Sequence, residues 1–431
     1  MSAEHRGTQP GGRKALVRAT RCADTGFVRA AASLGRPMGL PILEDLPDPT
    51  GKRVLLRATL ALPLSVDTDH PLARARAEGL ATTVQWLVER GAQVTVWGSP
   101  GSAPPAAVPT DDRFAVPHAA CAPVTRVRAV VRELEPALAG SSAMRTRTCT
   151  EDPRAVDRIV SEHDLFVNDS LQDSLLPLPS VMLPPSRLPS VIGRTLQRDL
   201  GALEPFVSGP DRPFVVVLGG ERTFQRLHGL VGLVLRADTV LLGGGLAFPM
   251  LQAVGRESPE GADDDFLWEC REVLGLAQRV RHRLVLPDDL VWSRDGQAHV
   301  SPTRMQEGDR VADIGPAACL RFGEELEGAA SVLWAGSVGR VEHEPFQAGT
   351  RALAAALRET QSIVFGGDAL VDLLSREQLR PAKAALLTAT DSAIEMLKSG
   401  NLPAITAIHD AAHRPETRPR GSSRGPSTAR R

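Results

Sequence analysis

The stretch Val217–Gly232, VLGGERTFQRLHGLVG, carries residue types and a spacing that suit the binding of a phosphate. An apolar run, PFVVVL, stops at Gly219 and Gly220, and Arg222 and Arg226 follow in what reads as the first turns of a helix. A strand that ends in a glycine-rich turn and opens a helix brings backbone N–H groups close to an anion, and arginines add positive charge. The pattern predicts one half of a phosphate-transfer site, and its other half has to be found elsewhere in the chain.

Short apolar runs alternate with helical patterns through the middle of the chain. The run at residues 53–58 precedes residues 79–92, whose apolar spacing is helical and stops at a glycine. Further strands are predicted at 93–98, 163–169, 212–220, 238–245, 282–289, 330–336, 361–368 and 383–389. Nearly continuous apolar strands separated by helices indicate an α/β fold with parallel sheets covered on both faces.

The carboxyl ends of these strands are the candidate ligand sites, because parallel sheets bind ligands beyond those ends. In the second half of the chain the strand ends carry glycines or acids at Gly219–Gly220, Gly243–Gly245, Asp288–Asp289, Gly336 and Gly366–Asp368. Five such ends are more than ordinary turns would supply, so they favour a ligand site in this half.

The two groups of strands are separated by residues 186–205, which read as an uninterrupted helical pattern and are interpreted as a connecting helix. We therefore expect an N-terminal domain at 38–190, a C-terminal domain at 191–400, and a cleft between them. Residues 401–431 are expected to form a return segment followed by a disordered tail rich in Arg, Pro and Ser.

Residues 1–37 are rich in arginine, poor in acids and without periodicity, so a disordered extension is predicted. The composition superficially resembles a transit peptide, but a solvated tail, or a true start at Met38, is the favoured explanation. With a net charge of −1, no overall field draws the chain to nucleic acid or membrane. The five scattered cysteines contain no CxxC pair, which argues against a zinc site and favours the cytoplasm.

The order of the motifs resembles that of the phosphoglycerate kinase family, from about Met38 to Ile408. LGGERTFQRL stands where the family has LGGAKVSDKI, ADIGPAA where it has LDIGPKT, and VFGGDA where it has IGGGDS. In the first half, GKRVLLRATLALPL is similar to GKRVLVRVDFNVPL, and FVNDSLQDS to YVNDAFGTA. The resemblance implies two Rossmann-like domains joined by a helix, in a cytoplasmic monomer.

It also implies a glycolytic activity, the reversible transfer of phosphate between 1,3-bisphosphoglycerate and ADP, which yields 3-phosphoglycerate and ATP with Mg²⁺. Phosphoglycerate would bind the N-terminal domain and the nucleotide the C-terminal domain, and domain closure would bring them together. Because the acceptor is a carboxylate, no general base is needed. Catalysis would rest on positioning and on charge stabilisation of the transferring phosphate.

The nucleotide half of the motif set is largely present. Arg222 and Arg226 replace two lysines of the family, Glu342 matches the acid at the ribose, and Asp368 matches the residue that holds the Mg-nucleotide. The implied nucleotide-binding residues are Gly219, Gly220, Arg222, Arg226, Gly243, Gly244, Glu342, Gly366, Gly367 and Asp368. The alternative is that the glycines persist only because their turns need positive φ.

The substrate half departs from the family. Its substrate-binding Asp and Asn are replaced by Thr59 and Ala61, its His and Arg in HLGRP by Ser99 and Ser102, and a His-Arg pair by Leu175–Leu176. A triple glycine that faces the transferring phosphate reads Ala-Thr-Asp, and a carboxylate at Asp391 would repel that phosphate. Arg76 matches the catalytic arginine, and a further family arginine could be Arg145 or Arg147.

Each charge-assisted hydrogen bond contributes about 1.5–3 kcal/mol, so the loss of several partners should weaken substrate binding by orders of magnitude. We therefore expect a phosphoglycerate kinase family protein with weak or no activity on phosphoglycerate. The alternatives are an enzyme of normal activity, a non-catalytic paralogue that binds nucleotide or a partner protein, and a kinase for another carboxylic acid.

Overall fold

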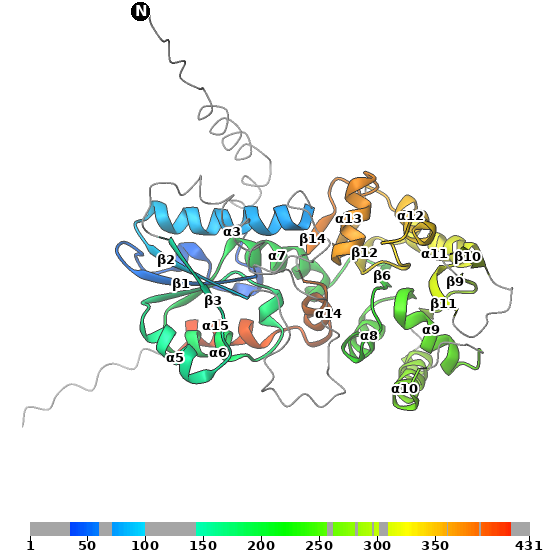
Figure 1. Cartoon of the computed structure of the whole chain (residues 1–431), viewed down its shortest axis with the longest axis horizontal. Helices are drawn as coiled ribbons and strands as arrows, with labels where there is room; N and C mark the ends of the chain where they lie inside the picture. The colour runs from blue at the N-terminus through cyan, green and yellow to red at the C-terminus, as the bar shows by residue number, and fades with distance from the viewer. Residues whose placement is uncertain are drawn as a thin grey trace, which may run out of the picture.

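The computed structural model of the protein contains two parallel β-sheets that lie side by side, each between layers of helices (Figure 1). It describes residues 35–59, 71–99, 144–256, 262–280, 283–294, 297–300, 309–359, 361–387 and 389–414. The tails predicted to be disordered fall almost entirely outside these residues. In the part of the chain that the structure describes, no helix has both the length and the apolar character needed to cross a membrane.

The first sheet has five parallel strands in the order β3-β2-β1-β4-β5. Its strands are β1 Arg53–Thr59, β2 Gln93–Ser99, β3 Met144–Thr148, β4 Leu165–Asn168 and β5 Ser190–Ile192. Side chains alternate between its faces. Val54 and Leu56 pack with helix α3 (Pro71–Glu89), whereas Leu55 packs with helices α5 (Pro153–Ser161) and α6 (Pro179–Arg187) on the other face.

The second sheet has six parallel strands in the order β14-β13-β12-β6-β7-β8. Its strands are β6 Phe214–Leu218, β7 Thr239–Leu242, β8 Arg283–Val285, β12 Ser331–Ala335, β13 Ser362–Gly366 and β14 Ala385–Leu387. One face is covered by α7 Arg194–Ser208, α8 Phe224–Arg236, α9 Gly244–Ala253, α10 Asp264–Val280 and α14 Thr390–Ser399. The other face is covered by α11 Pro316–Glu327, α12 Ala348–Ala355 and α13 Asp368–Arg376.

Every strand predicted from the sequence is confirmed, and so is the helix expected at 79–92, which overlaps α3 and ends at Glu89. A small antiparallel sheet was not foreseen. It has the order β10-β9-β11, with β9 Leu290–Arg294, β10 Gln297–Val300 and β11 Arg310–Ile314.

The prediction of an uninterrupted helix over 186–205 is wrong. Helix α6 ends at Arg187, and the β-branched Val191 and Ile192 pair with β4 before α7 begins at Arg194. Pro189 and Gly193 account for the break, because proline disfavours a helical residue before it and Gly193 is the extended N-cap of α7. The first sheet therefore extends past residue 190.

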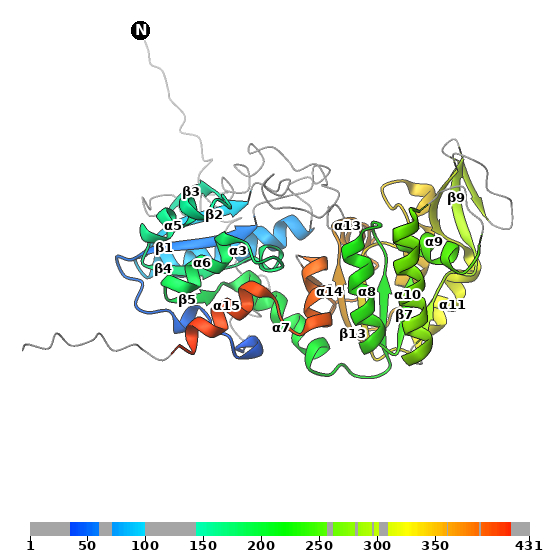
Figure 2. The same cartoon turned by 90° about the horizontal axis from the view of Figure 1, so that it is seen from below.

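Helices α7 and α14 lie between the two sheets, and helix α15 (Pro403–Ala412) returns to the first one (Figure 2). Helix α15 packs against α6 and β5, so the end of the described chain lies beside elements from its first half.

The order of the strands reverses direction once in each sheet. In the first sheet the chain moves outward on both sides of the β1–β4 neighbours, and in the second on both sides of β6 and β12. Loops leave in opposite directions at such a reversal, which is where open α/β sheets bind ligands. The carboxyl ends of β1 and β4, and of β6 and β12, are therefore the two places to look for a site.

Candidate functional site

Glycine turns from neighbouring strands meet at the reversal in the second sheet. Gly219 donates its N–H to Ala335 at 2.9 Å, Gly220 donates to Ser337 at 2.7 Å, and Gly336 donates to Gly366 at 2.8 Å. The ends of β6, β12 and β13 are thereby joined through their backbones.

These turns require glycine for both space and conformation. A Cβ on Gly219 would lie 2.1 Å from the carbonyl oxygen of Ser337, which is backbone and cannot turn away. Gly220, Gly336 and Gly367 have φ values of 79°, 83° and 112°, a region that favours glycine. The predicted residues Gly219, Gly220, Gly366 and Gly367 are therefore brought together, and Gly336 joins them.

The end of β7 adds a further turn. Gly244 donates its N–H to Val338 at 2.9 Å, and a Cβ on Gly244 would lie 2.5 Å from the nitrogen of Gly220. A Cβ on Gly243 would lie 2.7 Å from the side chain of Val338. The predicted pair Gly243 and Gly244 therefore packs directly on the Gly219–Gly220 turn.

Arg226 is the cation of this site. It lies in the first turn of α8, where its N–H donates to the hydroxyl of the N-cap Thr223 at 3.2 Å. Its Nη1 donates to the carbonyl of Gly219 at 2.5 Å, and its Nε donates to Asp391 at 3.1 Å. The guanidinium therefore lies against the glycine turn, and Asp391, expected only to repel an anion, is its ion-pair partner.

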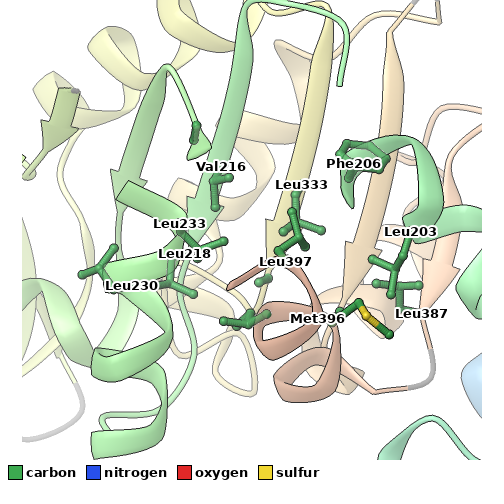
Figure 3. Packing of buried hydrophobic residues seen from close by; sticks show 14 of the residues in the cluster. Leu203, Phe206, Val216, Leu218, Leu230, Leu233, Leu333, Leu387, Met396 and Leu397 are labelled. Carbon is green, nitrogen blue, oxygen red and sulfur yellow. The ribbon is translucent and has the colours of Figure 1, made fainter. Parts of the chain in front are cut away.

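Two glycines on α8 set this pairing by letting α14 approach closely. A Cβ on Gly229 would lie 2.4 Å from Ile394, and one on Gly232 would lie 2.4 Å from Lys398. Leu230 and Leu233 of α8 and Leu397 of α14 belong to one apolar cluster under β6 (Figure 3). Gly229 follows Arg226 by three residues and Ile394 follows Asp391 by three, so the helix contact holds both side chains in register.

The other predicted nucleotide residues lie around this centre. Asp368 is the first residue of α13, directly after Gly367, and is partly exposed. Glu342 is exposed in the loop between β12 and the short helix Glu344–Phe346. Arg222 is exposed, and its guanidinium carbon lies 5.8 Å from the ring centre of Phe266 on α10.

The acids after β8 have a structural role. Asp289 accepts hydrogen bonds from Ala317 at 3.1 Å and Ala318 at 2.8 Å, so it caps the first turn of α11. Asp288 pairs with Arg321 at 2.7 Å. This strand end therefore does not contribute to the glycine site.

A different arrangement fills the reversal in the first sheet. Arg57 is 1% exposed and pairs with Asp173 at 3.1 Å. The hydroxyls of Thr59 and Ser170 hydrogen-bond each other across the ends of β1 and β4, and both reach the Asp173 carboxylate, at 3.3 and 2.7 Å. The Arg57 Nε has no hydrogen-bond partner among the described residues. Side chains, rather than glycine backbone, occupy this strand end.

Asp169 lies next to this cluster and ties the connecting helix to the first sheet. It is fully buried and accepts hydrogen bonds from Thr83 of α3 at 2.9 Å, Thr195 at 3.1 Å and the Leu196 N–H at 3.0 Å. Burial raises its pKa to about 7, against the opposing effect of these donors.

Several predicted substrate-side residues contribute no described contact. The backbone of Arg76 lies in α3, and its side chain, like those of Ser99 and Arg145, falls outside the described atoms; Ala61 and Ser102 fall outside the described residues. Leu176 is 52% exposed, and Arg147 pairs with Glu162 at 3.0 Å on the surface.

Comparison with known proteins matches most of the chain. The sequence profile described as Phosphoglycerate kinase matches residues 43–399. The chain belongs to the phosphoglycerate kinase family. A phosphoglycerate kinase of Streptomyces griseus is 30% identical over 394 residues, which cover 84% of this chain and 97% of that protein. One from Salinispora tropica is 29% identical over 401 residues, covering 86% of this chain and 100% of that protein.

Solved structures of this family share the fold. Phosphoglycerate kinase from Coxiella burnetii superposes with a TM-score of 0.65 at 22% identity, covering 86% of this chain and all of that one. The enzyme from Pyrococcus horikoshii gives a TM-score of 0.67 at 17% identity, with 86% of this chain and 99% of that one covered. The predicted two-sheet phosphoglycerate kinase fold is confirmed.

Sequence comparison alone missed Asp173. Against the phosphoglycerate kinase motifs, an Asp is replaced at Thr59 and a Thr is replaced at Asp173. The Thr59 hydroxyl lies 3.3 Å from the Asp173 carboxylate, so the carboxylate and the hydroxyl have exchanged places between the end of β1 and the short helix Gln172–Ser174. Asp173, the second Asp of FVNDSLQDS, was visible in the sequence, but only its contact with Thr59 shows that it occupies the place of the missing carboxylate.

Proposed function

We propose that this phosphoglycerate kinase family protein binds Mg-ADP or Mg-ATP at the glycine turns of the second sheet. The observation that carries the proposal is the meeting of the turns after β6, β7, β12 and β13 where the strand order reverses, with the Arg226 guanidinium against the turns after β6 and β12. A cation beside glycine turns, which let a ligand approach the backbone closely, suits a chain of phosphates at such a point.

The proposed roles follow from position. The Gly219–Gly220 backbone and Arg226 would contact the phosphates, Arg222 would add charge at the rim, and Gly243 and Gly244 would border the base. Glu342 would accept hydrogen bonds from the ribose. Gly366 and Gly367 would allow the phosphates to approach the start of α13.

The same site fits Mg²⁺ only together with a nucleotide. Among the residues that the structure describes, no group of three His, Cys, Asp or Glu is placed to hold a metal. Asp368 offers one carboxylate, and Mg²⁺ commonly uses one or two carboxylates with substrate phosphates and water. Bound there, Mg²⁺ would neutralise phosphate charge while the helix start and Arg226 orient the phosphates.

We propose that transfer to 3-phosphoglycerate is weak or absent. Arg57, the buried cation at the first strand reversal, is already paired with Asp173. The hydroxyls of Thr59 and Ser170 also contact that carboxylate, so the polar groups at this strand end are already engaged with one another. A non-catalytic nucleotide-binding or partner-binding protein, or a kinase for another carboxylic acid, is the alternative within the same proposal. The protein would act as a cytoplasmic monomer, with the acid-side and nucleotide-side domains meeting near α7.

Calorimetric titration tests the proposal. Wild-type protein should bind Mg-ADP, and Asp368→Ala should weaken that binding by about tenfold or more, since a charge-assisted contact is lost. Asp372→Ala is the matched control, one turn further along α13, and should leave the affinity unchanged. Absence of Mg-ADP binding to the wild type would refute the nucleotide site. Titration with 3-phosphoglycerate and a coupled assay then separate a weak enzyme from a non-catalytic protein.

A further inference from the structure

Arg226 already has an anionic partner supplied by the chain itself. The Asp391 carboxylate lies 3.1 Å from the Arg226 Nε, and the two side chains are 34% and 12% exposed. The same guanidinium donates to the Gly219 carbonyl, within the turn proposed to hold phosphate. A phosphate that binds Arg226 must therefore approach a group that is partly neutralised.

The pairing is built into the fold rather than formed by two mobile surface chains. Close packing at Gly229 and Gly232 fixes α8 against α14. Both helices also share an apolar cluster with strand β6, which holds them in place (Figure 3). Asp391 lies in the first turn of α14, where a negative charge is favourable. Asp391, at the start of α14, thus places a negative charge beside Arg226, which lies at the start of α8.

Thr390, the residue before Asp391, lies against the glycine turn after β13. Its hydroxyl oxygen would lie 2.9 Å from a Cβ on Gly366 and 3.8 Å from one on Gly367, so the start of α14 lies against the turn after β13. The Asp391 carboxylate is therefore next to the glycine turns and not at a remote surface.

We propose that Asp391 is an internal counter-anion that competes with a ligand's phosphate for Arg226 and lowers the affinity of the site for polyphosphate. This inference rests on the proposed phosphate site. A phosphate that displaces Asp391 gains a charge-assisted hydrogen bond but leaves a carboxylate beside it, and like charges at close range repel. Repulsion grows with the charge of the ligand, so the effect is larger for a triphosphate than for a diphosphate.

Tripolyphosphate and pyrophosphate, without a nucleoside, are the direct probes. Asp391→Asn keeps the shape of the side chain and removes its charge, and it should bind tripolyphosphate about tenfold more tightly than wild type. The gain for pyrophosphate should be smaller. Glu395→Gln, which removes an acid from the same helix, is the matched control and should change neither affinity.

A second background assigns the gain to Arg226. In Arg226→Gln protein, Asp391→Asn should give little further gain, because the group for which the two anions compete is absent. If Asp391→Asn leaves tripolyphosphate affinity unchanged or weakens it, or if the full gain persists without Arg226, the inference is wrong. These results are separable from the proposed function, because the bare polyphosphates test the anion competition while Mg-ADP tests the nucleotide site.

Discussion

Strand order reverses once in each sheet, but the two strand ends at these reversals are built differently: one from glycine backbone turns and the other from buried side chains. In the second sheet, backbone turns at Gly219, Gly220 and Gly336 lie against one guanidinium. In the first sheet, Arg57 and Asp173 fill the strand end with buried side chains. Replacing a glycine in the second sheet's turns would force neighbouring backbone to move, because the turns are in close contact. At the first reversal the contacts are made by side chains, so single substitutions can change them without moving the backbone.

The difference also separates what each region can bind. Arg226 keeps a partly exposed ion pair with Asp391, so an incoming anion can compete for it. Arg57 is enclosed, and its charge is balanced within the fold. The first reversal therefore has a structural function in addition to any binding, and the following changes test that contrast.

The largest expected effect is at Asp173. Asp173→Ala should lower the free energy of unfolding by about 3–5 kcal/mol, because it leaves the buried Arg57 charge without its partner. Urea unfolding followed by circular dichroism measures the loss. Arg57→Met together with Asp173→Leu should recover much of it, since removing both charges also removes their desolvation cost. A loss below about 1 kcal/mol in the single variant, the range of an exposed pair, would mean that water reaches Arg57 and that the first reversal is as open as the second.

A smaller effect is expected at the glycine turns. Gly219→Ala should cost about 2–3 kcal/mol, because its Cβ would overlap the Ser337 carbonyl unless two strand ends move apart. Mg-ADP affinity should fall as well. Gly275→Ala is the matched control, since this helical glycine has open space around it and alanine there should stabilise by up to about 1 kcal/mol. A Gly219→Ala protein as stable as wild type would show that the turns are not held together by contact.

Most of the fold could be predicted because hydrophobic periodicity reports buried parallel strands directly. Val215, Val216 and Val217 form such a run, and all three are buried. The short β5 was missed because three residues carry too little periodicity to be told from the neighbouring helical pattern. The antiparallel strands β9 to β11 were missed as well, although only two residues separate β9 from β10 and their pairing is local.

The candidate site could be predicted only where consecutive residues in the sequence determine the backbone geometry. Gly219 and Gly220 stand out in the sequence, since consecutive glycines directly after an apolar strand are typical of a turn in which two backbones approach closely. The pair of Arg226 and Asp391 could not be foreseen, because 165 positions separate the two residues and the contact depends on the packing of α8 against α14. The same holds for Arg57 of β1 and Asp173, which lies in the short helix Gln172–Ser174 after β4.

The smallest effect is expected at the other end of β1, where Arg53 pairs with Asp164 at 2.9 Å near the surface. Hydrogen bonds from Arg53 lower the pKa of Asp164 to about 2, from an ordinary value near 3.8. A lowered pKa means that the unfolded chain takes up its proton first as acid is added. The contribution of the pair is therefore present above about pH 4 and is lost as the pH falls toward about 2.

Asp164→Asn should consequently shift the urea midpoint only slightly at about pH 7 in roughly 0.15 M salt, more at low salt, and hardly at all at about pH 2. Two arginines of one strand, each paired with an aspartate, would then differ in importance only because Arg57 is enclosed and Arg53 is not. If Asp164→Asn cost as much as Asp173→Ala, the enclosure of Arg57 would not be the cause, and the contrast between the buried and open strand reversals would lose its physical basis.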